Sequence, residues 1–224
     1  GVSFEVEKGK TLAIIGNTGS GKSTILELIG RLYDVDRGTI DIDGEPIKTL
    51  NLNSLRSNIG FVPQDPFLFS DTLKNNIKFG NQNATDLEVI DAAKKAVVHE
   101  NIINFKKGYD TILGERGITL SGGQKQRVSI ARAFIKKPQI LLLDDCLSAV
   151  DTETEEQILN NIELVTKNKT TIIVSHRISS AKNADSIVVL NDGVITQKGT
   201  HNTLISVEGY YKELYQKQLR ETSN

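Results

Sequence analysis

The chain has 224 residues, enough for one well-buried core with room for an inserted subdomain. Hydrophobic residues make up 38% and charged residues 25% of the chain, as in globular proteins and unlike disordered or fibrous ones. The formal net charge is −1, without a block of like charges, whereas nucleic-acid-binding surfaces normally carry a clustered basic excess. We therefore expect no nucleic-acid partner.

Membrane and disulfide signals are absent from the sequence. No apolar run approaches the ~18 residues that a membrane-spanning helix needs, and the first residues lack the basic and apolar regions of a signal peptide. The chain has one cysteine, Cys146, so no internal disulfide can form and a reducing, intracellular setting is expected. A lone cysteine can also be a catalytic nucleophile, but the segment around Cys146 has a better explanation below.

The predicted elements begin with a strand, a glycine-rich turn and a helix. Residues 11–15 are apolar and typical of a strand, residues 16–21 are too rich in glycine for regular structure, and residues 23–32 have helical apolar spacing. Short strands are predicted next, at residues 39–42 and 59–62. Two helices are then predicted at residues 87–105 and 121–136, the second ending before Pro138.

Strand signals return after Pro138 and alternate with two further helices. The strands are predicted at residues 140–143, 171–175, 187–190 and 194–197, and the helices at residues 153–165 and 210–219. This alternation predicts an α/β fold with a mostly parallel sheet, interrupted by a helical insertion. We expect an α/β core at residues 1–69 and 137–224 and a helical subdomain at residues 70–136. In such sheets, ligands bind beyond the carboxyl ends of the strands.

The glycine-rich turn fits the phosphate-loop pattern G-x-x-x-x-G-K-[ST]. Its residues are Gly16, Asn17, Thr18, Gly19, Ser20, Gly21, Lys22 and Ser23, with Thr24 directly after them. Glycines let backbone N–H groups turn toward an anion, and the following helix directs its positive end at the phosphates. Lys22 supplies a charge to the outer phosphates, and the Ser23 hydroxyl can coordinate Mg²⁺. The sequence therefore predicts a nucleotide site.

A second acidic signal supports this prediction. The apolar residues 140–143 predict a strand buried on both faces, and Asp144 and Asp145 follow at its exit. Phosphate-loop enzymes hold the Mg²⁺ shell with such a carboxylate. We assign Asp144 to the metal shell and Asp145 to the water that attacks the phosphate.

Residues 120–124, Leu-Ser-Gly-Gly-Gln, resemble the signature sequence of ATP-binding-cassette (ABC) proteins at the start of a helix. Gln64 matches the Q-loop of that family, residues 148–151 match its D-loop, and His176 matches its switch histidine, all in the order and spacing of the family. The resemblance covers essentially the whole chain. It implies a RecA-like phosphate-loop core, an antiparallel β-subdomain, and ATP with Mg²⁺ as ligands.

The resemblance also implies roles for these residues. Two such domains would associate head to tail around two ATP molecules, each ATP lying between residues 16–24 of one domain and the signature of the other. That signature consists of Ser121, Gly122, Gly123 and Gln124, and Asp151 would complete the nucleotide site. Gln64 would join the Mg²⁺ and water shell, and His176 would contact the γ-phosphate. Asp145, His176 and Gln64 are the predicted catalytic residues, whereas His99 and His201 are read as structural.

Two stretches favour the exporter branch of the family: residues 67–70, and residues 108–117 before the signature. In exporters the segment around Glu115 contacts a transmembrane part, which would hold the chain at the cytoplasmic face of the membrane. The transmembrane part and a second ATP-binding domain are the expected partners. A soluble, non-transport ABC ATPase and a regulatory nucleotide-binding module are the alternatives.

The sequence departs from the family pattern at two places. Family members normally carry Glu where this chain has Asp145, which resembles the weaker half of heterodimeric exporters. We therefore expect a slow site in the chain's own phosphate loop, with a competent homodimer as the alternative. The aromatic residue that stacks on adenine in this family would precede Gly1, so we expect the β-subdomain to be partly truncated.

Overall fold

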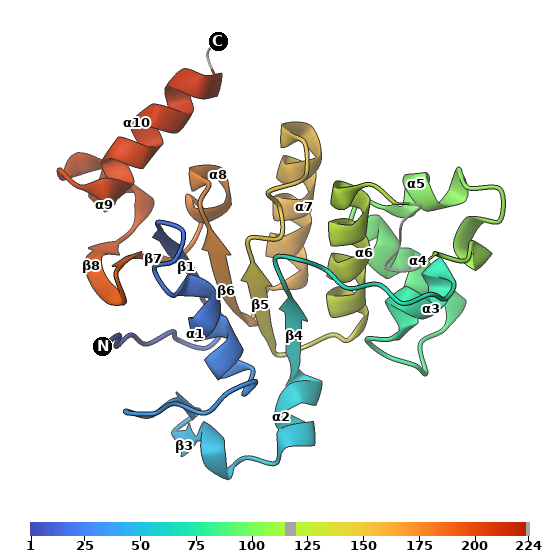
Figure 1. Ribbon diagram of the computed structural model, residues 1–224, viewed down its shortest axis with the longest axis horizontal. Helices are drawn as coiled ribbons and strands as arrows, with labels where there is room; N and C mark the ends of the chain where they lie inside the picture. The colour runs from blue at the N-terminus through green and yellow to red at the C-terminus, as the bar shows by residue number, and fades with distance from the viewer. Residues whose placement is uncertain (115–119, 223–224) are drawn as a thin grey trace.

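The structure is a computed structural model that describes residues 1–114 and 120–222. A six-stranded sheet with the order β4-β5-β6-β1-β7-β8 runs through the molecule (Figure 1). The first five strands in this order are parallel, and β8 pairs antiparallel with β7. The strands are β1 (Thr11–Gly16), β4 (Ile59–Val62), β5 (Ile140–Asp144), β6 (Thr170–Ser175), β7 (Ser186–Asn191) and β8 (Val194–Gly199). The predicted α/β class with a mostly parallel sheet is confirmed.

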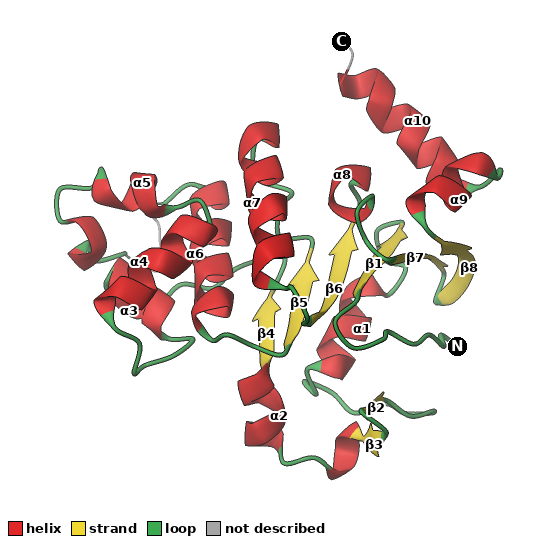
Figure 2. Cartoon of the chain, turned by 180° about the vertical axis from the view of Figure 1, so that it is seen from behind, coloured by secondary structure: helices red, strands yellow, loops and turns green. Residues whose placement is uncertain are grey.

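Helices cover both faces of this sheet and its two edges (Figures 1 and 2). The α-helices are α1 (Lys22–Ile29), α2 (Leu52–Asn58), α3 (Leu73–Lys78), α4 (Asp86–Lys95), α5 (His99–Ile103), α6 (Gly122–Ile135), α7 (Thr152–Val165), α8 (Ile178–Ala181), α9 (His201–Ser206) and α10 (Tyr210–Thr222). Two short 3₁₀ helices are η1 (Ile47–Thr49) and η2 (Gly108–Asp110), and a small antiparallel pair is formed by β2 (Asp41–Ile42) and β3 (Glu45–Pro46).

The strand β5, next to the edge strand β4, shows why both faces of the sheet are covered. Successive side chains of a strand point to opposite faces. Leu141 and Leu143 belong to one apolar cluster with Ile158 of α7, whereas Leu142 belongs to another cluster with Leu26 of α1. Apolar and polar residues therefore do not alternate along β5, because both of its faces pack against helices. This is expected for a parallel strand between two helical layers.

Parallel pairing brings the carboxyl ends of three strands to one edge of the sheet. Ile15 is in register with Ser175, and Asp144 is in register with Val174. Gly16, the last residue of β1, therefore meets Asp145 and His176, which follow β5 and β6, at the same edge. This is the edge at which open α/β sheets bind ligands.

The helix predicted over residues 87–105 is wrong as a single element. The helix α4 begins at a capping box between Thr85 and Glu88 and ends at Lys95, and α5 starts only at His99. Between them Val97 adopts a left-handed conformation with φ 54°, which a continuing helix does not allow. Apolar spacing continues across this break, so periodicity alone could not locate it.

Other predicted boundaries shift by a few residues. The helix predicted to reach residue 32 ends at Ile29, where Gly30 and the left-handed Arg31 follow. The strand predicted over residues 39–42 is paired only at Asp41–Ile42. The short helices α2, α3, α8 and α9 had no clear periodic signal, because one or two turns contain too few apolar positions.

The helices α3 to α6 gather beside β4, at one edge of the sheet (Figure 1). Their core is continuous with that of the sheet, since Val62 of β4 belongs to the same buried cluster as Ile77 of α3 and Val89 of α4. The boundaries predicted for a separate helical subdomain, at residues 70 and 136, stay a prediction. None of the helices in the described ranges combines the length and the apolar character required to span a membrane.

Candidate functional site

The phosphate loop joins β1 to α1 through a tight, left-handed turn. Gly19 and Gly21 have φ values of 82° and 96°, a backbone region that side chains with a Cβ rarely adopt. At Gly16 an added Cβ would lie 2.1 Å from the carbonyl oxygen of Leu190, so only glycine fits against the neighbouring strand. Three glycines of the sequence pattern are thus required by the structure: Gly19 and Gly21 by their backbone conformation, and Gly16 by close packing.

The loop offers polar groups to a ligand. The buried Ser20 hydroxyl has no hydrogen-bond partner among the described residues, although buried polar atoms are normally paired. Around it, Asn17, Thr18 and Gly19 are exposed at the turn, and Thr24 is exposed on the first turn of α1. An orphaned hydroxyl and a glycine cradle in front of a helix N-terminus fit a phosphate group.

Lys22 lies within the curve of this loop. Its Nζ donates to the carbonyl oxygens of Gly16 at 2.9 Å and Asn17 at 2.7 Å. Burial lowers the pKa of the Lys22 amine, and the negative charges of Asp145 and Asp144 oppose that shift. The amine is therefore positioned by backbone carbonyls beside two carboxylates, at the place where a polyphosphate would sit.

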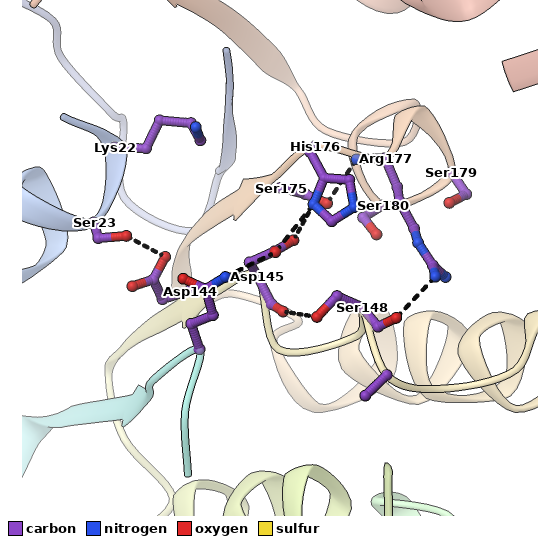
Figure 3. Close-up of polar contacts among 12 residues, drawn as sticks. Lys22, Ser23, Asp144, Asp145, Ser148, Ser175, His176, Arg177, Ser179 and Ser180 are labelled. Atoms are coloured by element: carbon purple, nitrogen blue, oxygen red, sulfur yellow. Dashed lines mark hydrogen bonds and ion pairs between the residues drawn. The ribbon is translucent and has the colours of Figure 1, made fainter. Parts of the chain in front are cut away.

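Ser23 and Asp144 form the candidate Mg²⁺ site. The Ser23 hydroxyl donates to Oδ1 of Asp144 at 3.0 Å, and Asp144 is buried at the end of β5 (Figure 3). Burial raises the pKa of Asp144, while the hydrogen bond from Ser23 opposes the rise. Mg²⁺ prefers oxygen ligands and commonly takes only one or two from protein, with phosphates and water as the others. A hydroxyl and a carboxylate in contact fit that requirement.

Asp145, His176 and Gln64 come together beside this pair. His176 Nδ1 lies 2.9 Å from Oδ1 and 3.0 Å from Oδ2 of Asp145 (Figure 3). Gln64 Nε2 lies 3.5 Å from Asp145 Oδ2, at the outer limit of a hydrogen bond. Burial raises the pKa of Asp145, and the contact with His176 opposes the rise. The structure therefore brings the three predicted catalytic residues into one cluster.

A carboxylate can only accept hydrogen bonds, so its contact with Nδ1 determines where the imidazole proton resides. The neutral His176 ring then carries its proton on Nδ1 and leaves Nε2 as an acceptor. The side chain of His176 is 54% exposed, against 12% for Asp145. The carboxylate is thus held inside, and the imidazole is accessible to a ligand.

The signature residues form the start of α6. The Ser121 hydroxyl accepts from the backbone N–H of Gln124 at 3.2 Å, and Gln124 Oε1 accepts from the N–H of Ser121 at 3.0 Å. This capping box leaves Ser121 and Gly122 exposed. At Gly123 an added Cβ would lie 2.8 Å from the carbonyl oxygen of Ala149, so the helix packs tightly on the D-loop.

The structure does not bring the signature to the chain's own phosphate loop. Within residues 1–114 and 120–222, no hydrogen bond or ion pair joins residues 121–124 to residues 16–24. Asp151 caps α7, where Oδ1 accepts from the N–H of Thr154 at 2.9 Å, and this hydrogen bond lowers the pKa of Asp151. Glu115, predicted to contact the transmembrane part, lies outside the described residues.

Sequence reasoning missed a buried cluster beside His176. The carboxylate of Glu155, on α7, is ion-paired with Arg177 and accepts from the hydroxyls of Ser179 at 2.6 Å and Ser180 at 3.1 Å. Arg177 also donates to the carbonyl oxygen of Ser148 at 2.9 Å (Figure 3). Arg177 follows the switch histidine directly, but nothing in the sequence marks Glu155, one of several glutamates near the start of that helix.

The remaining candidates lie outside the cluster around Asp145. His99 Nδ1 lies 2.9 Å from the hydroxyl of Tyr109, and His201 Nδ1 lies 2.9 Å from that of Tyr211. Cys146 is buried, and burial raises the pKa of its thiol, which keeps the sulfur protonated. A buried, protonated thiol does not fit a nucleophile.

Comparison with known proteins identifies the family. The sequence profile described as "ABC transporter" matches residues 1–148. The chain is 52% identical over 217 residues to ATP-binding cassette sub-family B member 6 of Xenopus tropicalis, covering 97% of this chain and 26% of that protein. It is 51% identical over 214 residues to a putative multidrug export ATP-binding/permease protein of Staphylococcus aureus, covering 96% and 37%.

A solved structure, that of a bacterial Atm1-family ABC exporter with ATP bound, superposes with a TM-score of 0.95. It is 46% identical to this chain and covers 98% of it, whereas the chain covers 39% of that structure. The chain thus spans between a quarter and two fifths of these relatives. With the phosphate loop, Ser23–Asp144 pair and Asp145–His176 pair on one sheet edge, these matches show that the chain belongs to the ABC transporter family and is an ATP-binding domain of that family.

Proposed function

We propose that this chain binds ATP with Mg²⁺ and hydrolyses it as the motor domain of an ABC exporter, at the cytoplasmic face of a membrane. The observation that carries the proposal is the grouping of Lys22, Ser23, Asp144, Asp145 and His176 at one edge of the sheet. A phosphate cradle, a hydroxyl–carboxylate pair and a carboxylate–imidazole pair are the parts that phosphoryl transfer to water requires. The relatives whose names state export support the direction of transport.

Each residue has a distinct task in this proposal. The loop N–H groups and the Lys22 amine bind the phosphates, and Ser23 with Asp144 would hold Mg²⁺. When bound, the ion neutralises charge on the phosphate oxygens. Asp145 orients the attacking water or accepts its proton, and it also orients the ring of His176. When both ring nitrogens carry a proton, His176 donates to the outer phosphate through Nε2. Gln64 lies at the edge of this group and reaches the same carboxylate.

The proposal includes a head-to-tail dimer. The signature residues Ser121 and Gly122 are exposed at the N-terminus of α6, a position that favours anion binding through free N–H groups and the helix dipole. The hydrogen bonds of the described residues do not join them to the chain's own phosphate loop. A second ATP-binding domain would bring its phosphate loop to this face and complete the site.

We further propose that the chain's own phosphate loop lines a slow site, paired with a faster one in a heterodimer. Asp145 is one methylene shorter than the Glu found in most of the family, and its two oxygens are both within 3.0 Å of His176 Nδ1. A displacement of about 1 Å can lower a catalysed rate by roughly 100-fold. The alternative is a competent homodimer, and the same intact Asp145–His176 contact supports it.

The transmembrane partner would dock on an exposed aromatic patch. Phe67, Phe69 and Phe79 are 54%, 38% and 56% exposed, and neighbouring rings lie 5.1 Å and 4.7 Å apart. The Arg132 guanidinium lies over two of these rings, and burial lowers its pKa to about 10. Grouped exposed aromatic side chains mark interaction sites. Phe67 and Phe69 closely follow Gln64 in sequence. A partner docked on the patch would therefore be linked to the ATP site through the backbone next to Gln64.

ATP binding and turnover by the purified chain test the proposal. Wild type should bind and hydrolyse ATP in the presence of Mg²⁺, and Lys22→Ala should lose binding by at least tenfold together with turnover. Lys8→Ala, which removes an exposed lysine before β1, serves as the matched control and should behave as wild type. Equal ATP binding by wild type and Lys22→Ala would contradict the proposed site.

A further inference from the structure

The loop that carries His176 is held by a side chain from the far end of the chain. Gln218, on α10, is 42 residues away from His176 in sequence. Its Nε2 donates to the carbonyl oxygen of His176 at 2.8 Å, and its Oε1 accepts from the N–H of Ile178, also at 2.8 Å. One amide therefore holds the backbone on both sides of Arg177, directly beside the imidazole.

Contacts on the other side hold the same loop against α7. The N–H of Arg177 donates to the Ser175 hydroxyl at 3.0 Å, and its guanidinium reaches Glu155 and the carbonyl oxygen of Ser148. The loop is thus fixed from α7 through ionic contacts and from α10 through the Gln218 amide. With both in place, the backbone of His176 has little freedom to move relative to Asp145.

The helix α10 is itself firmly placed, as a positioning element requires. Tyr211 is fully buried, its N–H donates to Gln197 Oε1 at 3.1 Å, and its hydroxyl lies 2.9 Å from His201 Nδ1. Leu214 and Tyr215 pack on an apolar cluster that includes residues of β1, β7 and α8. The Gln218 amide is therefore presented by a docked helix and not by a free chain end.

We propose that Gln218 is a positioning residue for His176: it holds the backbone of the switch loop so that the imidazole stays in contact with Asp145. The inference rests on the proposed function, since the pair is useful only if the site hydrolyses ATP. The two hydrogen bonds described above join Gln218 to the backbone of the switch loop, at His176 and Ile178. Its effect on the reaction passes through the loop backbone.

The kinetic test uses Gln218→Leu, which keeps the size of the side chain and removes both hydrogen bonds. We expect kcat to fall about tenfold with KM for ATP nearly unchanged, because displacement of a reacting group by a fraction of an ångström lowers the rate of the chemical step. Gln216→Leu is the matched control, since Gln216 is exposed on the same helix, and it should retain both parameters. An unchanged kcat for Gln218→Leu would overturn the proposal.

A double-mutant cycle shows whether the effect passes through the histidine. In a His176→Ala background, Gln218→Leu should cause no further loss of turnover, because the group that it positions is gone. Independent, multiplicative losses would overturn the proposal. If wild type and Lys22→Ala have the same turnover, the proposed ATPase function fails, and the positioning is then decided by the following measurement, which requires no hydrolysis.

The chain has three histidines, whose imidazole resonances can be followed by NMR at constant pH. The resonances of His176 report directly on the loop. Gln218→Leu should shift the His176 resonances and leave those of His201 in place, since His201 contacts Tyr211 and Tyr215 and so reports on the docking of α10. Unchanged His176 resonances would overturn the proposal. A shift of His201 as well would mean that α10 is displaced as a whole, and Gln218 would then be merely structural.

Discussion

His176 Nδ1 lies within 3.0 Å of both carboxylate oxygens of Asp145, and the backbone of Asp145 is left-handed, with φ 43°. Aspartate is among the few residues with a Cβ that adopt this conformation with some frequency. Its N–H donates to the carbonyl oxygen of Val174 on β6, so the turn after β5 is tied to the neighbouring strand. A carboxylate is therefore held in a mostly buried position at the edge of the sheet where β1 ends and the phosphate loop begins.

Neutralising this carboxylate should stabilise the fold. Burial raises the pKa of Asp145, so its neutral form is the one that folding favours. That contribution to stability is complete below the ordinary pKa of aspartate and is lost as the pH rises through the raised pKa of the folded state. Asp145→Asn, which is neutral at every pH, should thus be more stable than wild type at pH 7. Urea unfolding at pH 7 and near pH 4 tests this, with the difference shrinking at the lower pH; a less stable Asn variant at pH 7 would contradict it.

The two signature glycines should respond differently to a methyl group. Gly123→Ala should lower the free energy of unfolding by about 1–3 kcal/mol, because the new Cβ would lie 2.8 Å from the carbonyl oxygen of Ala149. Gly122→Ala is the matched control, since its Cβ would meet only the side chain of Ala149 at an ordinary 3.7 Å. Denaturant unfolding of both variants measures the difference. Equal stabilities would mean that α6 does not pack on the D-loop as described.

Ser23 should matter for ATP binding only when Mg²⁺ is present. Ser23→Ala removes the hydroxyl that contacts Asp144 and should weaken the binding of ATP with Mg²⁺ by roughly tenfold or more. Binding of ATP in the presence of a chelator should change little. Ser23→Thr retains the hydroxyl and is the control. Calorimetric titration compares the two conditions, and an equal loss in both would argue against a metal ligand.

Glu155 should be far more important for stability than its neighbour. Glu155→Ala leaves Arg177, Ser179 and Ser180 without their buried acceptor, and removing one member of a buried ion pair costs about 3–5 kcal/mol. The Arg177 side chain is partly exposed, so we expect the lower end of that range. Glu156→Ala, on the exposed side of the same helix, should cost less than about 0.5 kcal/mol. Similar losses for both variants in urea unfolding would contradict the buried cluster.

The sheet and the phosphate loop were predicted well from the sequence. Both depend on positions that accept only a few residue types. Four consecutive apolar residues before Asp144 indicate a strand covered on both faces, and the glycines of residues 16–21 are required by backbone geometry and close packing. The grouping of Gly16, Asp145 and His176 also follows from simple rules, since all three lie at the carboxyl ends of parallel strands.

Other features could not be read from residue types. The break between α4 and α5 depends on a left-handed Val97, a conformation that tertiary packing imposes on a β-branched residue. The contact of Gln218 with the His176 loop joins two segments that no local pattern connects. The buried state of Glu155 depends likewise on three donors that come from the loop after β6 and from α8.

ATP turnover of Asp145→Glu, compared with wild type over a range of protein concentrations, tests the central claim most directly. Lys22→Ala gives the background rate. If Asp145 makes the chain's own site slow, the Glu variant should hydrolyse ATP at least tenfold faster than wild type. Equal or lower turnover for the Glu variant, with wild-type turnover rising more than linearly with concentration, would show that Asp145 works in a competent homodimer and would contradict the account.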